Sequence, residues 1–300
     1  MSDSMASLRR QIDSAADLQS VVRTMRALAA SGIGQYERAV AALVRYDRAI
    51  ALGLGVCLRA QTSFASVASA DRSIREAMAI AVVFGSDQGL VGQFNDVVVD
   101  HAIEALSGAA HKPLAWVVGE RAAARLVDAG IEVVRVYPVP STVDAIDMLV
   151  GQLQVDIETH PSQSAQPPLF VFHNRPLPGA LYEPGERRLL PLDAQWLSDA
   201  TRVPWPTSNP PEIIGEPAAM LRTLIREYLF ISLYRACAES LASENASRLA
   251  AMQRADKSID DTLETLHGTF DRLRQGAIDA ELFDVTAGYE SLASPSRKAT

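Results

Sequence analysis

Three glycines follow a run of apolar residues and raise the question of a phosphate-binding site. The segment reads VVFGSDQGLVGQFN over residues 82–95, with glycines at positions 85, 89 and 92. A strand that runs into a glycine-rich turn and then a helix often binds phosphate through its backbone amides. The P-loop pattern also needs a lysine, which this loop lacks, and the spacing differs from Gly-x-Gly-x-x-Gly. We therefore expect these glycines to permit a tight turn rather than to bind a nucleotide.

An acidic residue inside the turn is the candidate nucleophile. Asp87 lies between two glycines, as in a nucleophile elbow, and would need a base such as His173 or His267. We expect His267 on the solvated side of a long helix, which disfavours that arrangement. The histidines and cysteines show no metal-ligand spacing, so we expect no metal and no other cofactor. The sequence gives no positive evidence for catalysis.

The composition is that of a globular chain large enough for two structural units. It has 300 residues, of which 48% are hydrophobic and 21% charged, with a net charge of −8. The negative charge argues against a general nucleic-acid binder. The start, MSDSMASLRR, is too polar for a signal peptide, and the longest apolar run is far shorter than the ~20 residues of a membrane span. Cys57 and Cys237 could form one disulfide, but two free buried thiols are favoured.

The C-terminal part of the chain carries the pattern of a coiled coil. Alternating steps of three and four residues from Leu221 to Ala280 reach an almost continuous apolar series. Its polar exceptions are Arg235, Asn245 and Asp256. Because no proline interrupts this part, one helix is expected from about Pro217 to about Ala287.

The N-terminal part shows the same pattern. The steps run from Leu8 to Cys57 and predict a helix over about 7–59, with polar exceptions at Gln19, Arg26 and Asp47. A helix with such a wet apolar stripe is not stable alone, so the two helices are expected to pair. An all-helical bundle with two further helices in the middle is the alternative.

The middle of the chain does not favour that bundle, because strands and helices alternate in it. Expected strands cover 78–84, 113–119, 131–137 and 168–174, and an edge strand covers 186–192; expected helices cover 95–108, 120–130 and 141–158, the last capped by Ser141 or Thr142. This alternation predicts an α/β unit with a mainly parallel sheet and helices on both faces. The expected domains are an N-terminal coiled-coil helix (1–60), an α/β domain (77–200), a proline-rich linker (201–217), a C-terminal coiled-coil helix (218–288) and a flexible tail (289–300).

Three segments resemble the gamma subunit of F-type ATP synthases. Residues 7–31 are similar to the N-terminal shaft helix of the family, with its A-M and A-A-S elements. Residues 84–95 resemble its S-x-D-R-G-L-C-G-x-x-N loop. Residues 239–288 are similar to its closing signature, with S-E-x-x-x-R-x-x-A-M and R-Q-x-x-I-T-x-E-L elements. The resemblance covers both ends well and the middle loosely.

The resemblance implies an antiparallel coiled coil of the two chain ends beside an α/β domain. It implies that the two end helices form a non-catalytic rotor shaft inside a ring of alpha and beta subunits, and that the α/β domain is a foot that meets the epsilon subunit and the membrane ring of c subunits. Rotation would couple ion flow to ATP synthesis or hydrolysis. Membrane association would arise only through the complex, at the cytoplasmic face of the bacterial inner membrane.

The resemblance also implies roles for single residues. Met25, Arg248, Gln275 and Glu281 match family positions that contact the alpha/beta ring. Seam packing for Met25 and a solvated helix face for Arg248 and Gln275 are the competing interpretations. The foot loop is matched at Asp87, Gly89, Leu90, Gly92 and Asn95.

The sequence also departs from the family pattern. Gly32 and Gly34 follow A-A-S where basic residues are usual, Gln88 and Val91 replace arginine and cysteine, and Asp279 replaces threonine. Each glycine costs about 1 kcal/mol against alanine inside a helix, which marks a soft or closely packed point. These departures suggest a second, paralogous F-type ATPase that pumps sodium ions or protons as one alternative. A coiled-coil scaffold unrelated to rotation is the alternative from another class.

Overall fold

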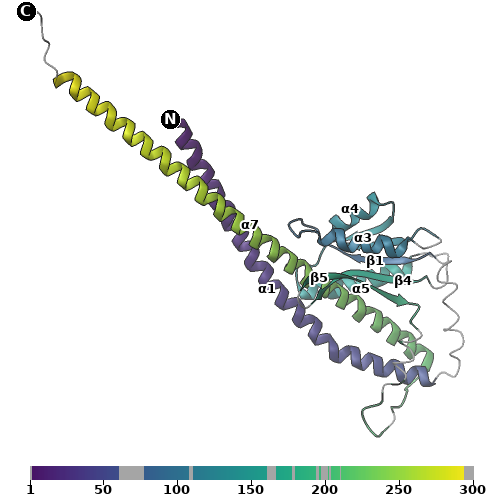
Figure 1. Ribbon diagram of the computed structural model, residues 1–300. Coiled ribbons are helices and arrows are strands. Elements are labelled where there is room, and N and C mark those ends of the chain that lie inside the picture. Colours follow the sequence, from purple (N-terminus) through teal and green to yellow (C-terminus); the bar gives the residue numbers. More distant parts are fainter. Residues whose placement is uncertain are drawn as a thin grey trace, which may run out of the picture. The chain divides into compact units, whose positions relative to one another are not determined.

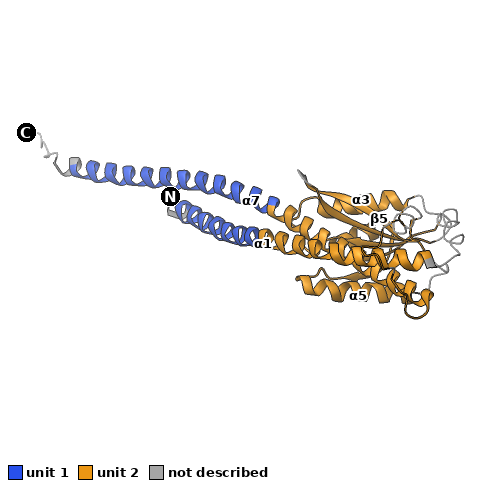
Figure 2. Ribbon diagram, turned by 90° about the horizontal axis from the view of Figure 1, so that it is seen from below, with its two compact units in different colours: residues 1–28, 250–300 blue, residues 29–249 orange. Residues whose placement is uncertain are grey.

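The computed structural model contains two long helices and a five-stranded sheet (Figure 1). It describes residues 2–60, 78–107, 111–160, 167–177, 180–193, 196, 202, 204–209 and 211–293. Two compact units are present, one of residues 1–28 and 250–300 (unit 1) and one of residues 29–249 (unit 2), as coloured in Figure 2. Both long helices contribute to both units.

The two long helices are those that the coiled-coil pattern predicts. Helix α1 spans Ser2–Ala60 and helix α7 spans Pro217–Ala293. Pro217 is the first residue of α7, where the missing amide hydrogen costs nothing. The helix continues six residues beyond the expected end at Ala287, so the first part of the expected flexible tail is helical; residues 294–300 lie outside the described residues.

The helices pair in antiparallel fashion within each unit. In unit 1, Asp256 forms ion pairs with Arg26 (2.6 Å) and Arg23 (3.1 Å), and Gln19 hydrogen-bonds Asp260. In unit 2, Asp47 forms an ion pair with Arg235 at 2.9 Å. As the residue number rises along α1, the number of its partner residue in α7 falls, as in Gln19 with Asp260 and Arg26 with Asp256. The helices are therefore antiparallel.

The sheet in unit 2 has the strand order β3-β2-β1-β4-β5. Its strands are β1 (Ile80–Phe84), β2 (Leu114–Val118), β3 (Glu132–Tyr137), β4 (Leu169–Leu177) and β5 (Ala180–Leu190). The first four are parallel, and β5 is antiparallel to β4. This confirms the mainly parallel sheet. The expected edge strand at 186–192 began six residues too late and ended two residues too late, since β5 spans Ala180–Leu190. Pro176 in β4 and Pro184 in β5 argued against strands in the sequence, but an edge strand tolerates proline.

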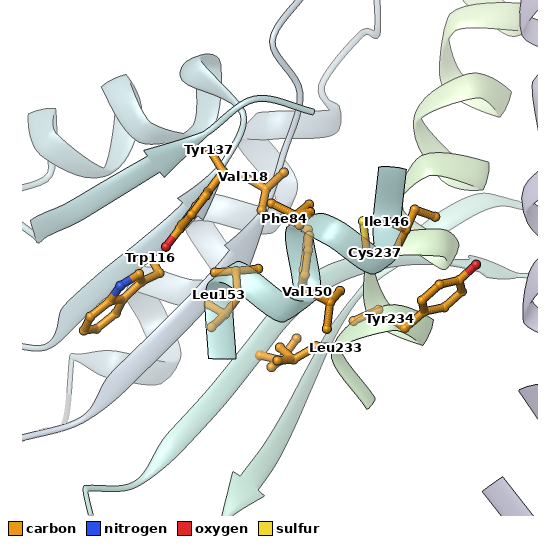
Figure 3. Packing of buried hydrophobic residues seen from close by; sticks show 14 of the residues in the cluster. Phe84, Trp116, Val118, Tyr137, Ile146, Val150, Leu153, Leu233, Tyr234 and Cys237 are labelled. Atoms are coloured by element: carbon orange, nitrogen blue, oxygen red, sulfur yellow. The ribbon is translucent and has the colours of Figure 1, made fainter. Parts of the chain in front are cut away.

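Helices cover both faces of this sheet, as predicted. Helices α3 (Phe94–Leu106) and α4 (Glu120–Asp128) pack on one face. Helix α5 (Val143–Thr159) and α7 pack on the other, with Trp116 and Phe84 among the buried side chains (Figure 3). The expected cap of α5 is Thr142, whose hydroxyl accepts from the amide of Ala145 at 3.3 Å.

Candidate functional site

The glycine loop brings the ends of two parallel strands close together. A Cβ atom on Gly85, just after β1, would lie 2.3 Å from the Cβ of Ala122. Gly119, just after β2, has φ +103°, and a Cβ there would lie 2.7 Å from the amide nitrogen of Ser86. Both positions therefore need glycine to let backbone and helix approach, which was predicted from the sequence for Gly85 but not for Gly119.

Side chains of the loop hold its own backbone in place. Asp87 accepts hydrogen bonds from the amides of Glu120 (3.0 Å, Oδ1) and Val139 (2.8 Å, Oδ2). Asn95 accepts from the amide of Ser86 at 2.9 Å and donates to its hydroxyl at 2.8 Å. Both carboxylate oxygens of Asp87 thus fasten neighbouring loops, which accounts for this residue without a nucleophilic role.

The histidines proposed as a base for Asp87 are engaged or placed elsewhere. His173 forms a 2.8 Å hydrogen bond with Glu239. His267 lies exposed on α7 in unit 1. Cys57 and Cys237 are free and buried, as favoured from the sequence. Within the described part of the chain, no cluster of three or more His, Cys, Asp or Glu side chains could hold a metal ion.

The tip of the loop exposes an apolar side chain in an unusual conformation. Leu90 has φ +64°, in the left-handed region that non-glycine residues avoid, and it is 60% exposed. Gly92 also has a positive φ, and a Cβ there would lie 3.6 Å from the hydroxyl of Ser247 on α7. A Cβ on Gly89 would lie 3.6 Å from Nη2 of Arg121.

Helix α7 fastens this loop from the other side. The hydroxyl of Ser247 donates to the carbonyl of Val91 at 2.5 Å, and that of Ser240 donates to the carbonyl of Phe84 at 3.4 Å. The serines lie seven residues apart, two turns along one face of the helix. The loop is therefore a rigid part of unit 2 that is fixed to α7.

The S-E-x-x-x-R motif of α7 points inward. Arg248 donates from Nη2 to Oε1 of Glu244 at 2.7 Å, and the two side chains are 15% and 6% exposed. Burial raises the pKa of the Glu244 carboxyl, whereas Arg248 acts in the opposite direction. The structure thus places Arg248 in an internal ion pair, rather than on the solvated helix face that we had weighed against partner contact.

The other three candidate contact residues lie in unit 1. Met25 is half-buried beside the seam residue Val22, whereas Gln275 and Glu281 are exposed on α7. The structure does not bring these candidates together into one site. It does show a feature that the heptad analysis missed: Ile278, Leu282, Phe283, Val285 and Tyr289 are exposed apolar side chains on the last turns of α7. These residues lie outside the heptad series. Their apolar character at positions outside the series is the sequence feature that could have predicted an exposed apolar surface.

Comparisons with known proteins agree with this architecture of two long terminal helices and an α/β unit. The model of the ATP synthase family matches residues 4–292. The ATP synthase gamma chains of Maridesulfovibrio salexigens and Clostridium botulinum are each 27% identical over 70% of this chain, covering 72% and 71% of those proteins. Two chains of the Euglena gracilis mitochondrial ATP synthase share the fold: one from the rotor (TM-score 0.63, 12% identity, covering 93% of this chain and all of that one) and one from the OSCP/F1/c-ring structure (TM-score 0.64, 13% identity, covering 100% and 98%).

The matches define a central-stalk protein of a rotary ATPase. The chain belongs to the ATP synthase family, as a gamma subunit. A gamma subunit is not itself catalytic, and family membership argues against the unrelated scaffold. Among the described residues, no helix is both long and apolar enough to cross a membrane.

Proposed function

We propose that this chain is the rotating shaft that couples ion flow through a membrane ring to ATP synthesis or hydrolysis in a ring of alpha and beta subunits. The observation that carries the proposal is the antiparallel pairing of α1 and α7, with cross-helix ion pairs at Asp256 and Asp47. Two paired helices resist twisting and bending better than one, which a shaft requires.

The shaft acts by contact rather than by chemistry. The two helices differ in sequence, so the rod has a different surface at each angle. In a ring of three catalytic sites, each rotational position then favours a different conformation of each site. Coupling of this kind needs only contacts that differ in free energy between states.

The exposed side chains of unit 1 support contact with the alpha and beta subunits. Apolar side chains at the end of α7, including Leu282 and Phe283, are exposed to water. A group of exposed apolar side chains is typical of a surface that binds another protein. We assign Met25, Gln275 and Glu281 to the same contact, and Arg248 to a contact that requires its release from Glu244.

The α/β domain of residues 77–200, which belongs to unit 2, is the foot of the shaft in this proposal. It would meet the epsilon subunit and the ring of c subunits, with Asp87, Gly89, Leu90, Gly92 and Asn95 forming the rigid foot loop. The chain would reach the membrane only through the complex, as a peripheral component on the cytoplasmic face of the bacterial inner membrane. We assign it no nucleic-acid partner.

Reconstitution tests the proposal. The ATPase rate of the alpha/beta ring is measured with and without this chain, and the chain should raise it. Replacement of Leu263 and Leu266 by aspartate places charges in the seam and should abolish the stimulation. Thr262→Asp with Thr265→Asp adds the same charges to exposed positions of the same helix and should preserve it. Full stimulation by the seam variant would refute the shaft.

A further inference from the structure

An ion pair within α7 is buried in unit 2 at the end of the helix segment that the sheet covers. Glu244 and Arg248 are one helical turn apart and meet through a single hydrogen bond of 2.7 Å. The Glu244 side chain is as inaccessible as an apolar core residue, at 6% exposed, and that of Arg248 is 15% exposed. An exposed pair at this spacing would be ordinary, but a buried pair loses the hydration of both charges.

The pair is also incompletely satisfied. Among the described residues, Oε2 of Glu244, Nε of Arg248 and the hydroxyl of the neighbouring Ser243 are buried without a hydrogen-bond partner. An arginine and a carboxylate often pair through two parallel hydrogen bonds, whereas Arg248 and Glu244 share a single hydrogen bond. Unsatisfied buried polar groups are costly and call for an explanation.

Among the described residues, the groups near Glu244 do not supply the missing partners. Tyr36 from α1 and Cys237 from α7 lie close enough to sense its charge, and so does Asp87 from the foot loop. Both oxygens of Asp87 already accept backbone hydrogen bonds. Asn245 next to it donates to the carbonyl of Leu241. The inward arrangement is thus held by one hydrogen bond and charge attraction.

We propose that Glu244 is a latch that holds Arg248 inside the free chain, and that Arg248 swings out onto an acidic group of the catalytic ring during assembly. The inference rests on the proposed function. The Arg248 side chain is 15% exposed although its Nε is buried, so part of the side chain already reaches solvent. In the outward position it regains water or a carboxylate partner, and the unsatisfied Nε gains an acceptor. The inward position leaves three polar atoms unpaired, but the outward one leaves the buried Glu244 carboxylate without Arg248, so the contact with the ring must offset that cost.

The latch can be weakened without altering the shape of the side chain. Glu244→Gln removes the charge that attracts Arg248 and should raise the association rate of the full chain with the alpha/beta ring about fivefold, the low end of typical coupling between sites. Arg248→Ala should slow association by about tenfold, because the outward contact is lost. Glu158→Gln is the matched control, since it changes the partner of the exposed Arg226 and should leave association unchanged.

The double variant identifies how Glu244 acts. If Glu244 works only through Arg248, then Glu244→Gln with Arg248→Ala should associate as slowly as Arg248→Ala alone. If Glu244→Gln speeds association equally in both backgrounds, the latch is refuted. If Arg248→Ala slows association but Glu244→Gln leaves it unchanged, the latch is refuted and the ring contact of Arg248 stands. If Arg248→Ala has no effect, that contact in the proposed function fails.

A measurement on the free chain keeps the test independent of assembly. The Nε hydrogen of Arg248 should exchange slowly with water in the unchanged chain and several-fold faster in Glu244→Gln, as followed by NMR of labelled arginine side chains. Arg254, which is exposed on the same helix, gives the reference rate. Exchange at Arg248 as fast as at Arg254 in the unchanged chain would overturn the latch, whatever the variants do to folding.

Discussion

The same two helices are held in different ways in the two units. Among the described residues of unit 1, α1 and α7 pack only against each other, and the buried residues include the polar Gln19 and Asp256. In unit 2, α7 is covered by α1 and also by the sheet, where Leu233, Tyr234 and Cys237 enter the main core. A seam of two helices leaves each turn only locally supported, whereas a core supports all its elements at once. Unit 1 should therefore open locally and unit 2 cooperatively.

The polar contacts of the two units differ in the same sense. Asp256 in unit 1 is buried but satisfied by two arginines of the other helix, so it fixes which turns face each other. The Glu244–Arg248 pair in unit 2 joins residues of one helix and fixes no register. Polar groups between two helices can thus fix their register, as in coiled coils. An ion pair within one helix does not affect the register, which leaves Glu244 available to hold Arg248 inside the chain.

The largest effect is expected from filling the close approach in unit 2. Gly85→Ala places a Cβ 2.3 Å from that of Ala122, so β1 and α4 must move apart, and unfolding free energy should fall by about 3 kcal/mol. Denaturant unfolding measures it. The control is Gly151→Ala in α5, where a Cβ meets nothing within 4 Å, and which should stabilise by about 0.5–1 kcal/mol. Equal effects would mean that unit 2 is not tightly packed at the loop.

The second effect tests whether unit 1 depends on its buried carboxylate. Asp256→Ala leaves Arg26 without its partner and Arg23 with only the longer contact to Asp260 (3.6 Å), and because both arginines are half-exposed the loss should be about 1–2 kcal/mol. Hydrogen exchange should rise in residues 10–28 and 250–270 while unit 2 keeps its protection. Asp261→Ala, at an exposed position of the same helix, should change little. Faster exchange throughout both units would erase the contrast between them.

The third effect sharpens the helix contact in unit 2. A Cβ on Gly32 would lie 2.9 Å from Oδ1 of Asn245, so Gly32→Ala should destabilise slightly, by up to about 1 kcal/mol, despite its better helix propensity. In an Asn245→Ala background the same change should stabilise by about 1 kcal/mol. Thermal unfolding of the four chains gives the coupling. Additive effects would show that the two residues do not touch in solution.

The smallest effect concerns the strained tip of the foot loop. Leu90→Gly relieves a positive φ at a mostly exposed side chain and should stabilise unit 2 by about 0.5–1 kcal/mol. Leu90→Ala keeps the strain and should not. The melting temperatures of both variants measure the difference. A gain with alanine as large as with glycine would mean that exposure, and not backbone strain, is the unfavourable feature.

Periodicity made the shaft and most of the sheet predictable. Every residue on the stepped series from Leu8 to Cys57 is buried or half-buried. The charged exceptions in the two series face one another, as Arg26 with Asp256 and Asp47 with Arg235. Matching opposite charges between the two seams would have predicted the register as well, which is information that the sequence contained.

The inward position of Arg248 and the β4–β5 hairpin were not predictable in this way. A heptad series describes one buried face, but α7 has two in unit 2, so the second face shows no separate signal. Prolines obscured the hairpin because their cost depends on whether a strand lies at an edge, which is a property of the sheet and not of the segment. The positive φ of Leu90 is imposed by the fastened loop around it.

The antiparallel register of α1 and α7 constrains how such a chain can change in length. Because each turn of one helix has a fixed opposite turn in the other, an insertion in one seam shifts all pairings beyond it. A viable insertion or deletion must therefore come in whole heptads and appear twice, once near each end of the gene. The lengths of the two paired helices must therefore change together in evolution, although opposite ends of the gene encode them.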